Sequence, residues 1–348
     1  MNAWARLPHS GQGLTAFDEV WHRSFHRMFF IGSRYPLRTL ISLLSGKRVR
    51  PSPEFVCRVR KDLNALLELD IQNVKAGYYP KSALSFPLFS YLYSAAILGS
   101  LDVFRVINRA KNNNWQELPP HAYSGSYPDY YLRTFHWQTD GWFSEKSARR
   151  YDASVQFLFG GVADIMRRMA LPPISRSISG RKNTHILELA CGTGSFLPQI
   201  QAAFPDANLY GIDLSPDYIR YARKHIKGNN IHFINQNLEN ISFKNETFDA
   251  VICNNLFHEL PPQVRRTVFG ETYRVLKKNA VFSITDSLQL DDDSVFNDSI
   301  KYFSKRFHEP FYEQYISDDL KGIFEEYGFE ASDAKINLFS KSIHGTKR

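Results

Sequence analysis

The chain has 348 residues, of which 43% are hydrophobic and 22% are charged, so a soluble globular protein larger than a common single domain is expected. Its three cysteines lie far apart and form no CxxC pair. That spacing argues against a disulfide framework and a thiolate metal site, so we expect no metal and a reducing, cytoplasmic compartment. The net charge of +8 is concentrated at the start, because residues 1–61 hold eleven basic and three acidic side chains.

Residues 1–125 are predicted to be a basic, mainly helical accessory region. From Phe17 to Leu44, arginines are interleaved with aromatic and aliphatic residues. Such a pattern is typical either of peripheral contact with an anionic membrane, through basic residues 17–61, or of a helical unit packed on a core. Residues 82–101 carry no charge but contain proline and glycine, so they fit a buried or interfacial helix better than a membrane span. No apolar signal-peptide core stands at the N-terminus, so we expect no secretory signal.

A leucine-rich helix is predicted over 62–74, and a linker over 111–128. After the linker, residues 130–142 are unusually aromatic. Ser144 is then placed to cap a helix over 145–169.

A strand, a glycine turn and the start of a helix are predicted over 184–196. The strand is a nearly continuous apolar run, typical of a strand buried on both faces. Gly192 and Gly194 allow a sharp bend and the close approach of a ligand. A dinucleotide fingerprint needs a third glycine, but Leu197 stands there. Glu188, at the end of the strand, suits a ligand with a cationic group better than a pyrophosphate.

Residues 188–194, with the sequence ELACGTG, resemble the first motif of class I S-adenosylmethionine (SAM) methyltransferases, with Ala190 in place of the usual first glycine. The chain is similar to the type 11 and ubiquinone/menaquinone-biosynthesis enzymes of that class. Residues 130–168 resemble a group of largely uncharacterised bacterial and plant methyltransferases. The resemblance implies SAM as the cofactor, and it implies that His136, Gln138, Asp140 and Tyr151 face the site.

The resemblance also indicates which residues would bind each part of the cofactor. Asp213, at the end of a strand predicted over 208–213, would accept the ribose hydroxyls. Asn237 and Leu238 would hold the adenine edge, with Gln236 as second choice, and Asn254 would lie at the methionine end. The predicted cofactor-binding residues are Glu188, Ala190, Cys191, Gly192, Thr193, Gly194, Asp213, Leu214, Asn237, Leu238 and Asn254.

The order of elements predicts an α/β fold with a doubly wound, seven-stranded, mostly parallel sheet over residues 126–348. The remaining strands are expected at 231–235, 248–254 and 280–287, and a hairpin is expected to pair 330–337 with 338–343. Helices are expected at 194–203, at 262–276, at 318–327 and in a segment that begins at 216. The long connection 288–317 is expected to be a loop that forms a lid or wall on the substrate side.

The segment after the fourth strand points to the acceptor class. Its sequence, NNLFHELP from Asn254, lacks the Asn-Pro-Pro-Tyr motif of enzymes that methylate adenine or glutamine amides. It resembles small-molecule methyltransferases, so a small or lipophilic acceptor is expected and nucleic acid is not. The other interpretations are an RNA or protein methyltransferase, a SAM-binding protein without turnover and, with less support, an NAD(P)-dependent oxidoreductase.

Methyl transfer from a sulfonium is an in-line displacement that depends mostly on alignment and on excluding water. An acceptor that must lose a proton also needs a base. The candidate catalytic residues are His258, His308, His136, Glu259 and Asp286, with Glu309 as a further carboxylate.

Overall fold

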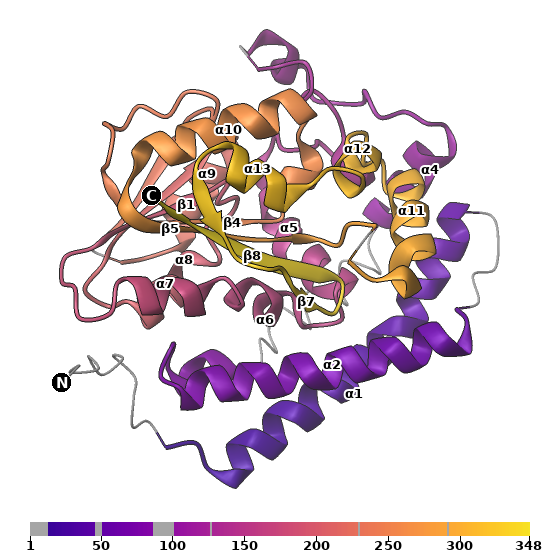
Figure 1. Cartoon of the computed structure of the whole chain (residues 1–348). Helices are drawn as coiled ribbons and strands as arrows, with labels where there is room; N and C mark the ends of the chain where they lie inside the picture. The colour runs from indigo at the N-terminus through magenta and orange to yellow at the C-terminus, as the bar shows by residue number, and fades with distance from the viewer. Residues whose placement is uncertain (1–12, 46–50, 86–100, 126, 229, 291) are drawn as a thin grey trace.

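A computed structural model of the chain describes residues 13–45, 51–85, 101–125, 127–228, 230–290 and 292–348 (Figure 1). The strands are β1 His185–Leu189, β2 Asn208–Asp213, β3 Ile231–Asn235, β4 Phe248–Asn254, β5 Leu276–Ser287, β6 Phe329–Ala331, β7 Lys335–Asn337 and β8 Ser340–Lys347. The longer helices are α1 Ala16–Ser45, α2 Pro53–Lys75, α4 Leu101–Lys111, α5 Glu145–Leu158, α6 Ala163–Arg168, α7 Leu171–Ser177, α8 Leu197–Ala203, α9 Pro216–His225, α10 Pro262–Val275, α11 Asn297–Arg306, α12 Tyr312–Ile316 and α13 Leu320–Glu326.

The sheet has the order β3-β2-β1-β4-β5-β8-β6, and β7 pairs with β8. Strands β1 to β5 are parallel, whereas β8 runs antiparallel to β5. The predicted doubly wound, mostly parallel sheet is therefore confirmed, with eight strands among the described residues in place of the predicted seven. Between β1 and β4 the chain switches from one side of the sheet to the other, and in such sheets ligands bind beyond the carboxyl ends of the strands at this switch point.

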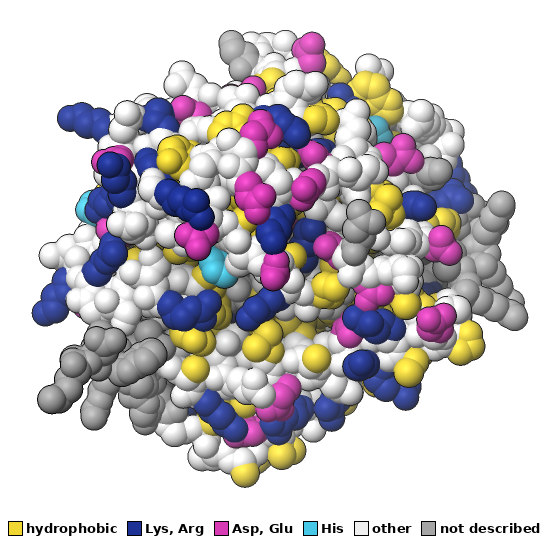
Figure 2. All heavy atoms as spheres, in the orientation of Figure 1, with side chains coloured by type: hydrophobic (Ala, Val, Ile, Leu, Met, Phe, Trp, Pro, Cys, Tyr) yellow, Lys and Arg dark blue, Asp and Glu magenta, His cyan; other side chains and the backbone are white. Residues whose placement is uncertain are grey.

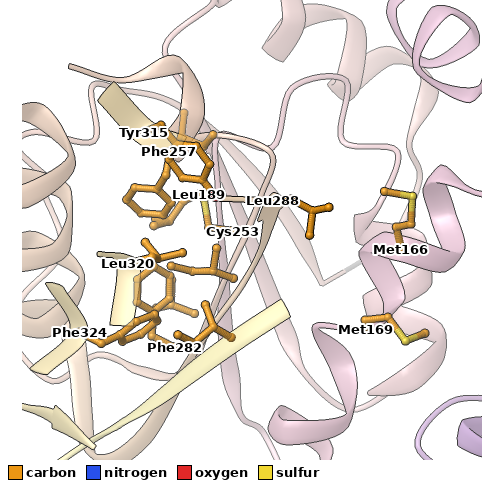
Figure 3. Close-up of a cluster of buried hydrophobic side chains, with 14 of the residues drawn as sticks. Met166, Met169, Leu189, Cys253, Phe257, Phe282, Leu288, Tyr315, Leu320 and Phe324 are labelled. Carbon is orange, nitrogen blue, oxygen red and sulfur yellow. The ribbon is translucent and has the colours of Figure 1, made fainter. Parts of the chain in front are cut away.

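Both faces of the sheet are covered, because the central strands alternate apolar side chains toward each face. Leu187 and Leu189 of β1 share a core with α10 and α13, whereas Ile186 shares one with α7, α8 and α9. Figure 3 shows part of the first core, where Phe282 of β5 lies near Phe324 of α13.

The N-terminal helices α1 and α2 lie side by side along one edge of the molecule, with α2 nearer the sheet (Figure 1). Their apolar residues belong to the same core as α6 and β1. A buried ion pair joins the two parts: Arg168 of α6 donates two hydrogen bonds to Asp70 of α2, at 3.0 and 2.6 Å. His22 of α1 lies 3.2 Å from the same carboxylate. The division of the chain at residue 125 stays a prediction.

The helix expected over 145–169 is wrong as one element, because α5 ends at Leu158 and α6 begins at Ala163. Between them, Gly160 and Gly161 have φ of +62° and +78°. A Cβ on Gly161 would lie 2.8 Å from the ring of Phe29 in α1. The two glycines therefore both turn the chain and allow α1 to approach, which a helical periodicity cannot indicate.

The connection 288–317 was also predicted wrongly as a loop, because it contains the short helix η5 Ser294–Phe296 followed by α11 and α12. Buried aromatic and aliphatic residues anchor these helices to the main core, among them Phe296, Ile300 and Tyr315. Strand β5 begins at Leu276, four residues earlier than expected, and the strand expected over 330–337 is divided into β6 and β7.

The remaining elements are the short helices η1 Lys81–Leu84, η2 Pro120–Ser124, η3 Phe135–Trp137 and η4 Phe257–Glu259. Most of the uncharged segment 82–101 lies outside the described residues. Within the described part of the chain, none of the helices is both long and apolar enough to cross a bilayer.

Candidate functional site

An open cavity with an empty volume of about 1020 Å³ lies at the switch point of the sheet. Ten of the eleven predicted cofactor-binding residues line it: Glu188, Ala190, Cys191, Gly192, Thr193, Asp213, Leu214, Asn237, Leu238 and Asn254. Gly194 does not line the cavity. It stands behind the turn, where a Cβ would lie 2.6 Å from the ring of Phe233.

The turn after β1 presents bare backbone to the cavity. Ala190, Gly192 and Gly194 all have positive φ, of 49°, 55° and 73°. A Cβ on Gly192 would meet only the ring of Tyr151, 4.0 Å away, so this position opens into the cavity. The left-handed conformation costs an alanine about 1–2 kcal/mol, which the surrounding fold must offset at Ala190.

Two polar side chains at the bottom of the cavity lack hydrogen-bond partners of good geometry among the described residues. They are Glu188, through Oε2, and the partly buried Asn254, through both atoms of its buried amide. Burial raises the pKa of Glu188 to about 8, although Arg167 and Asn254 oppose this shift. A buried carboxyl oxygen without a donor is favourable only if a cation or donor reaches it, so this end of the cavity suits a positively charged group.

Asp213, at the end of β2, also lines the cavity. Its carboxylate accepts hydrogen bonds from the backbone N–H of Gly192 and of Ser215, each at 2.8 Å. Burial raises the pKa of Asp213 to about 6, and the two N–H donors limit this rise. The carboxylate is thus ionised at neutral pH and is held by the same turn that lines the cavity.

Several residues of the site were not predicted from the sequence. Arg167 of α6 lines the cavity, as do the aromatic residues Tyr130, Tyr131, Phe135, Trp142 and Tyr218. Asp152 of α5 accepts hydrogen bonds from the hydroxyls of Thr193 and Ser195, at 2.7 and 2.8 Å. Tyr130, Tyr131, Phe135 and Trp142 belong to the aromatic run 130–142, which indicated no particular role. Asp152, Arg167 and Tyr218 lie outside that run.

Of the four residues that the resemblance placed toward the site, only Tyr151 lines the cavity. The amide of Gln138 donates to the carbonyl of Gly141 and to the hydroxyl of Tyr218, and Asp140 accepts from Ser144. These contacts brace the segment before α5. Gln236, the second choice for adenine, donates instead to Asn240 and to Ser242.

The candidate bases lie at different distances from the cavity, and only one of them lines it. Glu259 lines the cavity. His258 and Asp286 form a buried pair, with Nδ1 2.5 Å from Oδ1, and Asp286 also accepts from the backbone N–H of Leu256 and Phe257. Burial lowers the His258 pKa, but Asp286 reverses this and raises it to about 9. This pair therefore fixes the segment after β4 and does not reach the cavity.

His136 lies behind Glu259. Its Nε2 is 3.3 Å from Oε1 of Glu259, and its Nδ1 is 2.7 Å from Oε1 of Glu309. His308 packs against the rings of Trp115 and Trp137, and burial lowers its pKa to about 4. The structure thus brings His136, Glu259 and Glu309 together and leaves His308 outside the group.

Residues 186–279 match the family model of a methyltransferase domain. This stretch of the chain is a methyltransferase domain. SAM carries an ammonium, a sulfonium and a ribose, and these fit the buried carboxyl of Glu188 with its unpartnered Oε2, the open backbone at Gly192 and the carboxylate of Asp213.

Curated relatives align over part of their length. Malonyl-[acyl-carrier protein] O-methyltransferase of Bacillus anthracis is 32% identical over 31% of this chain and 41% of its own length. Demethylmenaquinone methyltransferase of Geobacillus stearothermophilus is 25% identical over 49% of this chain and 68% of its own. The chain spans only 37% of the arsenite methyltransferase of Halobacterium salinarum. A SAM-dependent methyltransferase structure from Aquifex aeolicus aligns with 59% of this chain and 100% of its own, at 16% identity and a TM-score of 0.43.

Proposed function

We propose that this protein transfers the methyl group of SAM to a small, lipophilic acceptor. The observation that carries the proposal is the wall of the cavity beyond Asn254, which is formed by Leu256, Leu260, Val264 and Val268. Such an aliphatic wall favours an apolar substrate body, because it gains free energy by removing apolar surface from water. Glu259 is the charged side chain within this wall.

The cavity residues suggest a division of roles toward the cofactor. Glu188 and Asn254 would hold the ammonium, and Arg167, which lines the same end, would hold the carboxylate. Asp213 would accept the ribose hydroxyls, and the turn at Asn237 would hold the adenine.

SAM, when bound, supplies an activated methyl group. The chain's own task is to hold the acceptor in line with it and to exclude water. Two relatives support a lipophilic acceptor by their names, demethylmenaquinone methyltransferase and the phthiotriol/phenolphthiotriol dimycocerosates methyltransferase of Mycobacterium leprae.

The test is a transfer assay with methyl-labelled SAM and host extract, followed by separation of lipids, water-soluble small molecules, RNA and protein. We expect label in the lipid fraction. Label in RNA or protein would refute the acceptor class and favour the macromolecular alternative. SAM binding without label in any fraction would favour a binding protein without turnover, and NADH binding in place of SAM would favour an oxidoreductase.

We also propose a peripheral membrane contact through α1. Phe17, Trp21, Met28 and Ile31 follow one another at helical spacing and are at least half exposed, and the exposed Arg27 lies among them. Figure 2 shows apolar side chains mixed with basic ones along the lower edge, where Figure 1 places α1 and α2. An exposed apolar stripe on a basic helix suits an anionic bilayer surface.

Vesicle flotation tests the membrane contact. The protein should float with phosphatidylglycerol vesicles more than with phosphatidylcholine vesicles, and the Met28→Glu/Ile31→Glu variant should lose this preference. Phe104→Glu, at an exposed apolar position on α4, serves as the control. Equal flotation of all three proteins would refute the role of α1.

A further inference from the structure

A cluster of one histidine and two carboxylates stands beside the cavity, which one of its members, Glu259, lines. It consists of His136 in η3, Glu259 in η4 and Glu309 between α11 and α12. One donor atom from each residue lies within 4.8 Å of the others. Three segments that are far apart in sequence therefore present donors to one small volume.

The Glu309 carboxylate is the decisive member. Its side chain has no exposed surface, and neither oxygen makes a hydrogen bond of good geometry within the described part of the chain. The contact of 2.7 Å with Nδ1 of His136 is short, but that nitrogen likewise lacks a partner of good geometry. Buried carboxylates are normally paired, hydrogen-bonded or bound to a metal, so these atoms indicate a shared ligand.

The surrounding structure holds the three segments in place. Buried Arg265 donates to the carbonyls of Phe257 and Phe311, which joins η4 to the start of α12. The indole of Trp137 donates to the carbonyl of Arg306, which joins η3 to the end of α11. His136 itself has φ of +54°, a conformation that a non-glycine residue keeps only when its surroundings impose it.

We propose that His136, Glu259 and Glu309 bind a divalent cation at the acceptor end of the cavity. One imidazole with two carboxylates is a donor set that suits Zn²⁺ or Mn²⁺, because Mg²⁺ prefers oxygen ligands alone. Three protein ligands leave coordination positions free, and Glu259, which lines the cavity, places the cation next to the space that an acceptor would occupy. The cation would therefore select an acceptor with an oxygen donor, such as a hydroxyl or carboxylate. This selection rests on the proposed methyl transfer, whereas cation binding does not.

The test uses the full chain after treatment with a chelator. Zn²⁺ is titrated by calorimetry and Mn²⁺ by electron paramagnetic resonance, and we expect one site per chain. Losing an outer-shell partner commonly weakens metal binding 10–100-fold, so losing a ligand through Glu309→Gln or Glu259→Gln should cost at least about tenfold. Glu313→Gln removes an exposed carboxylate four residues from Glu309 and should change nothing.

SAM affinity is measured on the same samples and shows that each variant is folded. Absence of Zn²⁺ and Mn²⁺ binding in the wild-type chain would overturn the proposal, as would binding that survives both substitutions. His136 would then be an imidazolium held between two carboxylates. Transfer of label that is lost with chelator and restored by the cation supports the role toward the acceptor. Transfer that is insensitive to chelator overturns that role, and cation binding without any transfer refutes the proposed function alone.

Discussion

Replacing Glu188 with glutamine keeps the shape of the side chain and removes its charge. With a pKa of about 8 in the free protein, roughly one Glu188 carboxyl in thirty is ionised at pH 6.5 and about one in four at pH 7.5. The proposed pairing with the ammonium of SAM requires the ionised form of Glu188. The affinity of the wild-type chain for SAM should therefore rise about eightfold between pH 6.5 and pH 7.5.

The direction of this pH dependence follows from the direction in which SAM binding shifts the pKa of Glu188. A bound ammonium lowers the pKa of Glu188, so binding at pH 6.5 should release close to one proton. At pH 7.5 the substitution should weaken binding by roughly 3–40-fold, because the 1.5–3 kcal/mol of a charge-assisted hydrogen bond is reduced by the cost of ionising a carboxyl that is only about one quarter ionised. The difference should shrink as the pH falls.

Calorimetry in two buffers of different ionisation enthalpy measures both the affinity and the proton release. Glu325→Gln, an exposed glutamate on α13, is the matched control and should behave as the wild type. A Glu188→Gln variant with wild-type affinity, or wild-type binding without proton release, would refute the placement of the ammonium.

Asp213→Ala should weaken SAM binding by at least about tenfold in calorimetry, because charge-assisted bonds worth roughly 1.5–3 kcal/mol are lost; unchanged affinity would refute the ribose assignment. Asp70→Asn should lower the free energy of unfolding by about 3–5 kcal/mol in urea titration, since Arg168 stays buried without its counter-charge; a loss below about 1 kcal/mol would show that the pair is not needed. Gly161→Ala should destabilise by about 1–3 kcal/mol in the same assay, because its φ of +78° and the nearby Phe29 ring both disfavour a Cβ; wild-type stability would contradict the close approach of α1.

The central strands and the glycine turn could be predicted because the residues that specify each of them are neighbours in the sequence. Strands β2, β3 and β4 have the predicted bounds, since each is an apolar run that ends at a polar residue or a turn. The same reasoning missed the start of β5, where Lys277, Lys278 and Asn279 continue the strand with side chains that avoid the core. Polar residues at the beginning of an inner strand carry no sequence signal of pairing.

Features that depend on distant parts of the chain were not predictable. The break at Gly160 exists because α1 packs there, more than a hundred residues away in sequence. The approach of Glu309 to His136 requires the fold of residues 288–317, which the sequence suggested to be a loop. Arg167 was missed because a charged residue in an apolar helix gives no sign of which cavity it lines.

Adjacent residues of α6 serve two different parts of the molecule. Arg167 lines the cavity, whereas Arg168 is held by Asp70 of α2. Since the backbone of one short helix turn sets both side chains, strain in the N-terminal helices would be transmitted to the cofactor pocket. A random screen for weakened SAM binding should therefore recover substitutions in α1 and α2, although none of their described side chains lines the cavity. The N-terminal region would then be under selection for activity as well as for stability.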